Sequence, residues 1–381
     1  MIFARCAAAF ALITLNLGAT LPAQAQGIAC GTPAARNDGW KIGTAASAGL
    51  DDTRLCAVTK WLKGLPQANI HAVVVARRGT LAFEQYFAGD DEIWGRPLGK
   101  VEHGPAVQHD LRSISKSVTG LLVGIALDRK LIASIDEPVF KFFPEQADLR
   151  TKEKDHLLIR HLLTMSTGLA WNENIPYSDP ANPERRMTDA PNPYRFVLEQ
   201  RLAEPPGKEF NYNGGATQLL AGIIQKVSGK PLETFARETL FAPLGITEFT
   251  WVKMPNGDAS AASGLRLAPR DLAKIGQLVL ARGQWNGRRI VSADWIVQST
   301  TPQIEAIDFL FYGYQWWLGR SMLDKRELPW SAGMGLGGQR LFVVPGLDLV
   351  VVINAGLYAS PMQRWVPWEI FRRYVVNAMR P

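Results

Sequence analysis

The chain has 381 residues, of which 47% are hydrophobic and 20% are charged. This composition excludes a disordered or low-complexity protein, and the length suffices for one large domain or two interlocked ones with a buried core. The net charge of +7 is spread along the sequence with no basic run longer than pairs such as Arg77-Arg78, which excludes a nucleic-acid groove.

The N-terminus has the order of a secretory signal peptide. Arg5 precedes an apolar run over residues 6–17, and the small-x-small triplet Ala23-Gln24-Ala25 follows. We expect cleavage after Ala25. The alternative is an uncleaved membrane anchor, but the apolar run is shorter than the roughly twenty residues that a span needs. The expected protein is therefore periplasmic or secreted, with no integral membrane span once the signal is removed.

Two cysteines remain after this cleavage. Cys6 belongs to the signal peptide, whereas Cys30 and Cys56 lie in the N-terminal region of the mature chain. An oxidising compartment permits a disulfide between them. Sequence separation says little about the geometry of their Cβ atoms, so a bridge and two free thiols stay equally open.

Hairpin patterns occur near both ends of the chain. Residues 71–76 are apolar and rich in β-branched side chains, Arg78-Gly79 is typical of a turn, and residues 80–87 alternate in polarity. A second hairpin pattern joins residues 340–344 to residues 349–353. Helical patterns occupy most of the remaining chain. We expect helices at residues 51–65, 113–129, 159–165, 194–201, 217–227, 232–239, 270–281, 293–299 and 362–379.

The order of these elements predicts an α+β arrangement within the broad α/β class. Residues 26–112 and 262–381 would form one antiparallel sheet covered by the terminal helices, and residues 113–261 would form an inserted, mostly helical region of the same domain. A site is expected in the cleft between the two parts. Residues 175–193 are the longest irregular stretch, and they either cover that cleft or form a merely structural loop.

The sequence Ser113-Ile114-Ser115-Lys116 places a hydroxyl and an amine three residues apart at the start of a predicted helix. Three residues are close to one helical turn, so both groups lie on one face. A lysine beside a serine can take its proton or tune another base, which makes the hydroxyl a nucleophile. The plain alternative is a helix capped by Asp110 or Ser113 that carries a solvated lysine.

Two further segments contain the remaining groups that such a site needs. Tyr212 lies in a short glycine-bounded loop, and we expect Lys116 to lower the pKa of its phenol so that it can take the serine proton. Residues 330–339 are rich in glycine, and an exposed N–H there can donate to an oxyanion. The N–H of Ser113, at the positive end of its helix, would be the other donor. The alternatives are a tyrosine packed under a loop and an ordinary flexible loop.

Taken together, these segments resemble the serine β-lactamase-related hydrolases, in the class C-like branch that includes 6-aminohexanoate-dimer hydrolase and family VIII-type esterases. The resemblance implies a β-lactamase/transpeptidase-like fold and an acyl-enzyme mechanism. It implies that Ser113 is the nucleophile, Lys116 the amine beside it, Tyr212 the proton relay and Gly333 the second oxyanion donor. The matching segments are residues 113–120, 161–169, 269–273 and 337–339, with Tyr212 in its loop.

Two departures from the family pattern bear on the substrate. Gly214 stands where the tyrosine loop often has asparagine, which removes a contact to a substrate amide. Trp330-Ser331-Ala332 stand where penicillin-interacting members have Lys-Thr-Gly, so the lysine that attracts a carboxylate is absent. Both departures argue against an efficient β-lactamase or D,D-peptidase and favour small esters or amides. The expected substrate contacts are Trp171, Asn213 and Trp330.

Other kinds of site have little support in the sequence. It has no G-x-S-x-G elbow, and its five histidines form neither an H-E-x-x-H motif nor a cysteine-histidine cluster, so neither a metal nor a cofactor is expected. His71, His156 and His161 are expected to be structural.

The function predicted from the sequence is that of a secreted serine hydrolase, an esterase or amidase, that forms an acyl-Ser113 intermediate. Its expected partner is a small-molecule ester or amide, and no nucleic-acid partner is expected. The alternatives left open are a weak β-lactamase or D-amino-acid peptidase, and a non-catalytic sensor or binding module of the same fold. The oligomeric state is not predicted.

Overall fold

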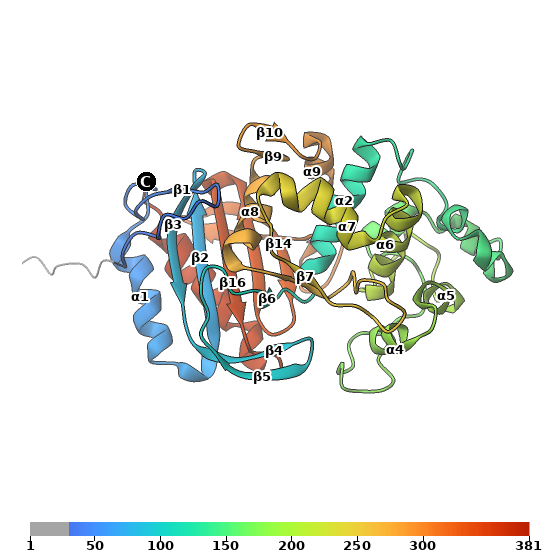
Figure 1. Ribbon diagram of the computed structural model, residues 1–381, viewed down its shortest axis with the longest axis horizontal. Coiled ribbons are helices and arrows are strands. Elements are labelled where there is room, and N and C mark those ends of the chain that lie inside the picture. Colours follow the sequence, from blue (N-terminus) through green and yellow to red (C-terminus); the bar gives the residue numbers. More distant parts are fainter. Residues whose placement is uncertain (1–29, 381) are drawn as a thin grey trace, which may run out of the picture.

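The computed structural model describes residues 30–380 of the chain. The predicted signal peptide, with Cys6 and the cleavage after Ala25, lies outside the described residues. A broad sheet forms one side of the molecule and a group of helices forms the other (Figure 1). Among residues 30–380, none of the helices combines the length and the apolar character that crossing a bilayer requires.

The main sheet has nine strands and draws on both ends of the described chain. Its order is β1-β3-β2-β16-β15-β14-β13-β12-β11, and all neighbours are antiparallel except β1 and β3. The predicted antiparallel sheet built from both termini is therefore confirmed. In sheet order the strands span Lys41–Ile42, Thr80–Tyr86, Ile70–Arg77, Leu349–Ala355, Gln339–Val344, Arg326–Gly335, Trp317–Leu323, Phe311–Tyr312 and Ile304–Glu305.

Two adjacent interior strands of this sheet are β2 and β16, whose residues are all buried. Both strands are nearly continuous runs of apolar and β-branched residues, which strands covered on two faces require. Their register places Val73 opposite Ile353. The two predicted hairpins, β2–β3 and β15–β16, are confirmed. Arg78 and Gly79 in the first turn both have positive φ (52° and 70°), as a tight type I′ connection needs.

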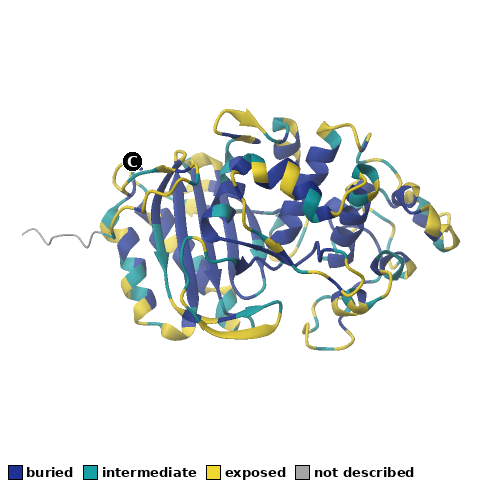
Figure 2. Cartoon of the chain, viewed as in Figure 1, coloured by how far each residue is buried: buried dark blue, intermediate teal, exposed yellow. Residues whose placement is uncertain are grey.

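Helical segments cover both faces of the sheet, so its strands lie in the interior (Figure 2). On one face are α1 (Asp52–Lys63) and the C-terminal segment η9 (Ile370–Val375). There Phe342 of β15 stacks on Phe371 with ring centroids 4.0 Å apart. On the other face α8 (Pro269–Leu280) packs against β2, β15 and β16.

The helical part of the fold is built around two packed helices. α2 (Ile114–Asp128) packs against α6 (Gly214–Ser228) and also contacts β14 and β15. α2 is buried over nearly its whole length, which explains why its sequence is apolar on most sides. Further helices in this part are α3 (Ile159–Leu163), α4 (Pro183–Asp189), α5 (Pro193–Glu199), α7 (Leu232–Ala236) and α9 (Ala293–Ser299).

Several short strands complete the described fold. A small sheet has the order β6-β8-β7, in which β6 lies just before α2 and β8 just before α8. Two separate hairpins are β4–β5 and β9–β10. The bounds are β4 Gly89–Ile93, β5 Arg96–Val101, β6 His109–Asp110, β7 Thr250–Trp251, β8 Leu265–Leu267, β9 Gln284–Trp285 and β10 Arg288–Arg289.

Two segments differ from the sequence predictions. The helix predicted over residues 362–379 is divided into η8 (Pro361–Arg364), α10 (Val366–Glu369), η9 and η10 (Val376–Ala378). Pro367 has no N–H to continue a helix from η8, which accounts for the break between η8 and α10. The stretch 175–193, predicted to be irregular, contains α4. Asn182 caps that helix by accepting the N–H of Glu184 over 2.9 Å.

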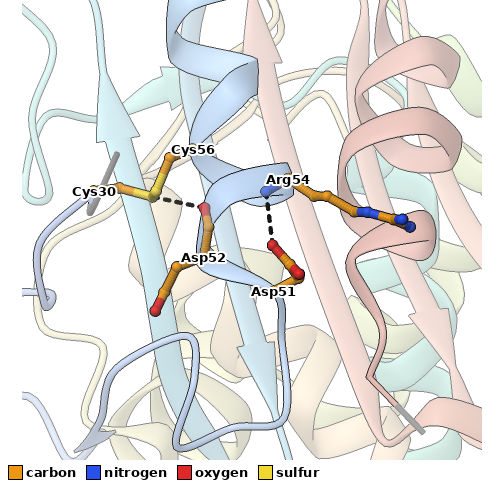
Figure 3. The surroundings of a disulfide bond; sticks show 5 residues. All are labelled: Cys30, Asp51, Asp52, Arg54 and Cys56. Carbon is orange, nitrogen blue, oxygen red and sulfur yellow. Dashed lines mark hydrogen bonds between the residues drawn. A yellow bond between two sulfur atoms is a disulfide. The ribbon is translucent and has the colours of Figure 1, made fainter. Parts of the chain in front are cut away.

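A disulfide joins Cys30 to Cys56 of α1 (Figure 3). The Cα atoms are 5.3 Å apart, within the usual range for a bridge. Asp51 caps α1 by accepting the N–H of Arg54 over 3.0 Å. Of the two alternatives that the sequence leaves open, the structure contains the bridge, which ties the first described residues to a helix that covers the sheet.

Candidate active site

Ser113 lies at the junction of a short strand and a long helix. Between β6 and α2 the chain turns sharply at Arg112, which has a φ of 49°. Ser113 occupies the N-cap position of α2, yet its side chain makes no capping hydrogen bond. Asp110 does not cap the helix either, because its carboxylate accepts the N–H of Trp94 over 2.6 Å and pairs with Arg266. The Ser113 hydroxyl is therefore free for other partners.

Lys116 follows Ser113 by about one turn of α2, and its amine is directed at the serine hydroxyl. Lys116 Nζ lies 3.2 Å from Ser113 Oγ and donates to the carbonyl of Ala262 over 3.0 Å. The side chain is only 1% exposed. The plain alternative of a solvated lysine is therefore wrong, because the surrounding helices enclose the amine beside the hydroxyl.

The loop before α6 brings Tyr212 to the same hydroxyl. Tyr212 is hydrogen-bonded to Ser113, and Lys116 Nζ lies 4.8 Å from the centre of its ring. Burial raises the pKa of Tyr212 well above its ordinary value of 10, and the charge of Glu173 raises this pKa further. The expectation that Lys116 lowers the pKa is wrong, because the cost of burying a phenolate outweighs attraction by the amine.

Glu184 is a buried carboxylate beside Lys116 that the sequence analysis missed. Its Oε2 is 3.8 Å from Lys116 Nζ. Oε1 accepts from the hydroxyl of Ser263 over 2.9 Å, whereas Oε2 has no hydrogen-bond partner within the described part of the chain. A buried oxygen without a partner is costly, so this carboxylate is held for its charge or for a ligand rather than for packing.

Glu173 forms the second half of an acidic pair with Glu184. It accepts from the indole N–H of Trp171 over 2.6 Å and from the hydroxyl of Tyr177 over 3.0 Å. Burial, and then the charge of Glu184, raise the pKa of Glu173 to about 7. Two carboxylates in one enclosed place cannot both ionise easily, so Glu173 titrates near neutral pH instead of being fully ionised there.

Gly214 leaves the space that this acidic pair occupies. A Cβ atom at this position would lie 2.4 Å from Glu184 Oε2 and 3.0 Å from Glu173 Oε1. The N–H of Gly214 also donates to Glu173 over 2.5 Å. The glycine therefore does not simply leave the place of the family's asparagine empty. The carboxylates of Glu173 and Glu184 occupy the space beside it.

The predicted oxyanion donors can be located on two elements. The N–H of Ser113 lies at the N-terminus of α2 and donates to no acceptor among the hydrogen bonds of the described residues. The pairing of β14 with β13 ends at Ala332 opposite Trp317. Residues 333–335 of β14 are thus free of β13 along one edge, which suits an N–H that must bind a ligand.

Gly333, the predicted second donor, lies on β14 against the first turn of α2. A Cβ atom at this position would meet the side chains of Ile114 and Ser117. Leu336, which follows β14, is the residue of this segment that lines the cavity with Ser113. The unpaired edge of β14 that includes Gly333 therefore borders the site, and the C-terminal end of β14 is the part of this edge nearest to the cavity.

Ser113 opens into a cavity of about 500 Å³, a volume typical of small-molecule sites. Glu92 and Trp94 of the β4–β5 hairpin line one part of it. Residues between Tyr177 and Asp189, which include part of α4, line another. The stretch 175–193 therefore covers the cleft, as one of the two sequence interpretations holds.

Two of the predicted substrate contacts support the site without lining this cavity. Trp171 is buried, and its indole holds the carboxylate of Glu173. Asn213 is completely buried, and its side chain caps α6 by accepting the N–H of Ala216 over 3.0 Å. Both residues stabilise the loop that carries Tyr212, so their predicted contact with substrate is replaced by a role in positioning.

The third predicted substrate contact, Trp330, lies on the opposite face of the sheet. Its ring packs against Phe342 and Trp368, and its indole N–H donates to Ser321 over 3.2 Å. Successive side chains of a strand point to opposite faces, and Trp330 belongs to the face covered by α1 and η9. The prediction that Trp330 contacts substrate is therefore wrong.

The arrangement of serine, lysine and tyrosine can be compared with known proteins. The sequence profile described as beta-lactamase matches residues 60–359, well over half of the chain. The chain belongs to the beta-lactamase family. It is 28% identical over 270 residues to 6-aminohexanoate-dimer hydrolase of Paenarthrobacter ureafaciens, and the match covers 65% of this chain and 66% of that enzyme, just under two thirds of its length.

Solved structures of the beta-lactamase fold superpose on most of this chain. A family VIII carboxylesterase has a TM-score of 0.65 at 15% identity and covers 87% of this chain and 98% of its own. A penicillin-binding protein homologue from Pyrococcus abyssi, described as octameric, has a TM-score of 0.63 at 20% identity, with coverage of 83% and 75%. The predicted β-lactamase/transpeptidase-like fold is confirmed.

Proposed function

We propose that this protein hydrolyses small esters or amides through an acyl-Ser113 intermediate. The observation that carries the proposal is the distance of 3.2 Å between Lys116 Nζ and Ser113 Oγ, with Tyr212 hydrogen-bonded to the same hydroxyl. A nucleophile needs a group that removes its proton and a group that protonates the leaving atom. Both groups are in contact with Ser113.

The proposed acylation assigns a role to each of the three groups. With Lys116 in its unprotonated form, Ser113 Oγ bonds to the substrate carbonyl carbon while its proton passes to Lys116 Nζ. As the bond from that carbon to the leaving group breaks, Tyr212 gives its proton to the leaving alcohol or amine and regains one from Lys116. Water then attacks the acyl carbon by the same route, which releases the carboxylic acid and restores Ser113. The raised pKa of Tyr212 suits a proton donor.

The negative charge on the carbonyl oxygen would be stabilised by two backbone N–H groups. We assign one to Ser113 and the other to the free edge of β14 that begins at Gly333. Preorganised donors of this kind contribute strongly because they are aimed at the charge before it forms. The start of α2 adds the positive end of its helix dipole.

We infer that the preferred substrate has no carboxylate close to the scissile bond. Three carboxylates, of Glu92, Glu184 and Asp189, and two arginines, Arg112 and Arg185, line the cavity. Of these charges, Glu184 lies beside Lys116 with one carboxylate oxygen unpartnered within the described part of the chain, and a negative charge at this place repels a carboxylate and attracts an ammonium group. A neutral ester, or an amide that carries an amine, as ω-amino-acid amides do, fits these charges better than a β-lactam.

We also propose that the protein acts in the periplasm or outside the cell as one catalytic domain over residues 26–381. The signal-like sequence before Ala25 supports export. The Cys30–Cys56 bridge agrees with an oxidising compartment.

Labelling with a fluorophosphonate, together with hydrolysis of short p-nitrophenyl esters, tests the acyl-enzyme proposal. Wild type should be labelled and active, whereas Ser113→Ala should be neither. Ser47→Ala, which removes an exposed serine far from α2 in the sequence, is the matched control and should behave as wild type. Equal inertness of wild type and Ser113→Ala in both assays would show that the proposal is wrong. A panel of esters, ω-amino-acid amides, D-peptides and nitrocefin then ranks the substrate classes.

A further inference from the structure

Three histidines and one aspartate converge at a place that the sequence analysis does not mark. His71 comes from β2, Asp91 from β4, His109 from β6, and His103 from the segment between β5 and β6. One nitrogen of each ring and one carboxylate oxygen all lie within 4.8 Å of one another. All four side chains are at most 2% exposed. Such a cluster needs a chemical explanation, because buried polar groups are normally paired.

Hydrogen bonds on the outer side of the cluster determine which nitrogen of the His71 and His109 rings carries the proton. The side-chain amide of Asn69 donates to the carbonyls of Asp90 and Gly356, so its oxygen faces His71 Nε2, which must therefore carry a proton. His109 Nδ1 faces the carbonyl of Asp110 over 3.0 Å and must carry a proton as well. In the neutral rings, His71 Nδ1 and His109 Nε2 are both left with lone pairs.

These two lone pairs face each other across 2.8 Å, the distance between His71 Nδ1 and His109 Nε2. Two acceptors cannot bond to each other, so a positive charge is required between them or on one of the rings. Both rings are almost completely buried, so a positive charge on either ring that no anion or ligand balances would be costly. A bound cation satisfies both nitrogens at once.

The other two members of the cluster point to the same conclusion independently. Neither His103 Nε2 nor Asp91 Oδ2 has a hydrogen-bond partner among the described residues, although both atoms are buried. They lie 3.9 Å from each other. Asp91 Oδ1 accepts from the hydroxyl of Tyr358 over 3.2 Å and lies 3.5 Å from His109 Nε2. The carboxylate is thus held in place from outside with one oxygen left free for a ligand.

We propose that His71, Asp91, His103 and His109 bind one Zn²⁺ ion. Three imidazoles and a carboxylate are a usual zinc ligand set, and ligand bonds of about 2.0 Å in a tetrahedron put the ligand atoms about 3.3 Å apart. The separation between His71 Nδ1 and His109 Nε2 is 2.8 Å, the three histidines lie 3.5 to 4.0 Å from one or other oxygen of Asp91, and all four ligand atoms lie within 4.8 Å of one another. Asn69, Tyr358 and the carbonyl of Asp110 supply the outer hydrogen bonds that zinc ligands normally have.

The proposed zinc is structural rather than catalytic, because four protein ligands leave no open position. It fastens the β4–β5 hairpin to β2 and to the segment that leads into α2. Glu92 and Trp94, which follow Asp91 in that hairpin, line the cavity beside Ser113. Glu92 also pairs with Arg112, the residue before the nucleophile. The ion would therefore hold one wall of the active site in place.

Metal content of the purified full chain tests this proposal directly. Wild type that is stripped with a chelator and then exposed to Zn²⁺ should retain one zinc per chain by elemental analysis and should melt at a higher temperature than the stripped protein. Co²⁺ in the same site should give the visible absorption bands of tetrahedral coordination. His103→Ala should weaken zinc binding by at least about a hundredfold.

The variants are chosen so that folding and metal binding are separated. His103 Nε2 makes no hydrogen bond, so His103→Ala removes none in the metal-free protein and should fold. Asp91→Asn keeps the size of its side chain and should also lose zinc. His156→Ala removes an exposed histidine outside the cluster and should bind zinc as wild type does. Absence of zinc from wild type that has been incubated with Zn²⁺ would overturn the proposal. Unchanged zinc affinity in His103→Ala and Asp91→Asn would do so as well.

Discussion

The side chains around Ser113 divide into those that move protons and those that set charge. Lys116 Nζ and the phenol of Tyr212 contact the hydroxyl directly, and the proposed mechanism gives each a separate step. We predict that Lys116→Ala and Tyr212→Phe each lower kcat for ester hydrolysis by at least about a hundredfold, the scale of lost acid-base catalysis. Steady-state kinetics on a p-nitrophenyl ester measures this. A near-normal kcat in either variant would remove that residue from the mechanism.

Glu173 gives the protein a pH dependence that can be predicted from its buried position. Its pKa is raised from 4.5 to about 7, so between these values the folded chain holds a proton that the unfolded chain has lost. Stability should therefore fall as the pH rises through this window. Glu173→Gln cannot titrate, and we predict a smaller drop in Tm between about pH 5 and pH 8 than in wild type. Parallel curves for the two proteins would contradict the assignment.

Sequence reasoning predicted the chemically distinctive residues of the site and missed those that depend on distant packing. Ser113 and Lys116 are separated by one helical turn, so their contact follows from local structure. Glu173 and Glu184 lie in a stretch without periodicity, and only the folded loop brings them beside Lys116. The pKa of Tyr212 was misjudged for the same reason, since burial is not visible in a loop sequence.

At the scale of whole elements, local chemistry predicted the two hairpins because a turn sequence separates runs of β-branched residues. The β4–β5 hairpin escaped prediction, since Gly89–Ile93 is mostly acidic and has no apolar alternation. The four proposed zinc ligands were not predicted from the sequence either, because they come from separate segments and show no motif spacing. Pro367 was the visible warning against one continuous C-terminal helix, and the apolar stripe of residues 362–379 outweighed it.

The disulfide is predicted to stabilise the attachment of α1 and the segment before it. Cys30 and Cys56 are 26 positions apart, and closing a loop of that length lowers the entropy of the unfolded chain by an amount worth about 3 kcal/mol. A variant with both cysteines changed to serine should lose about that much free energy of unfolding in a denaturant titration. Reductant should destabilise wild type similarly and leave the double variant unchanged. Equal stability of all samples would contradict the prediction.

At the scale of the whole molecule, the order of the sheet governs when this protein can fold. β2 pairs with β16, and Val73 meets Ile353, which is 280 positions later in the chain. During synthesis, β2 waits roughly tens of seconds before its partner leaves the ribosome. A nascent chain therefore carries an unpaired, apolar interior strand for most of its time on the ribosome, and it needs a chaperone or prompt export to protect that strand from aggregation.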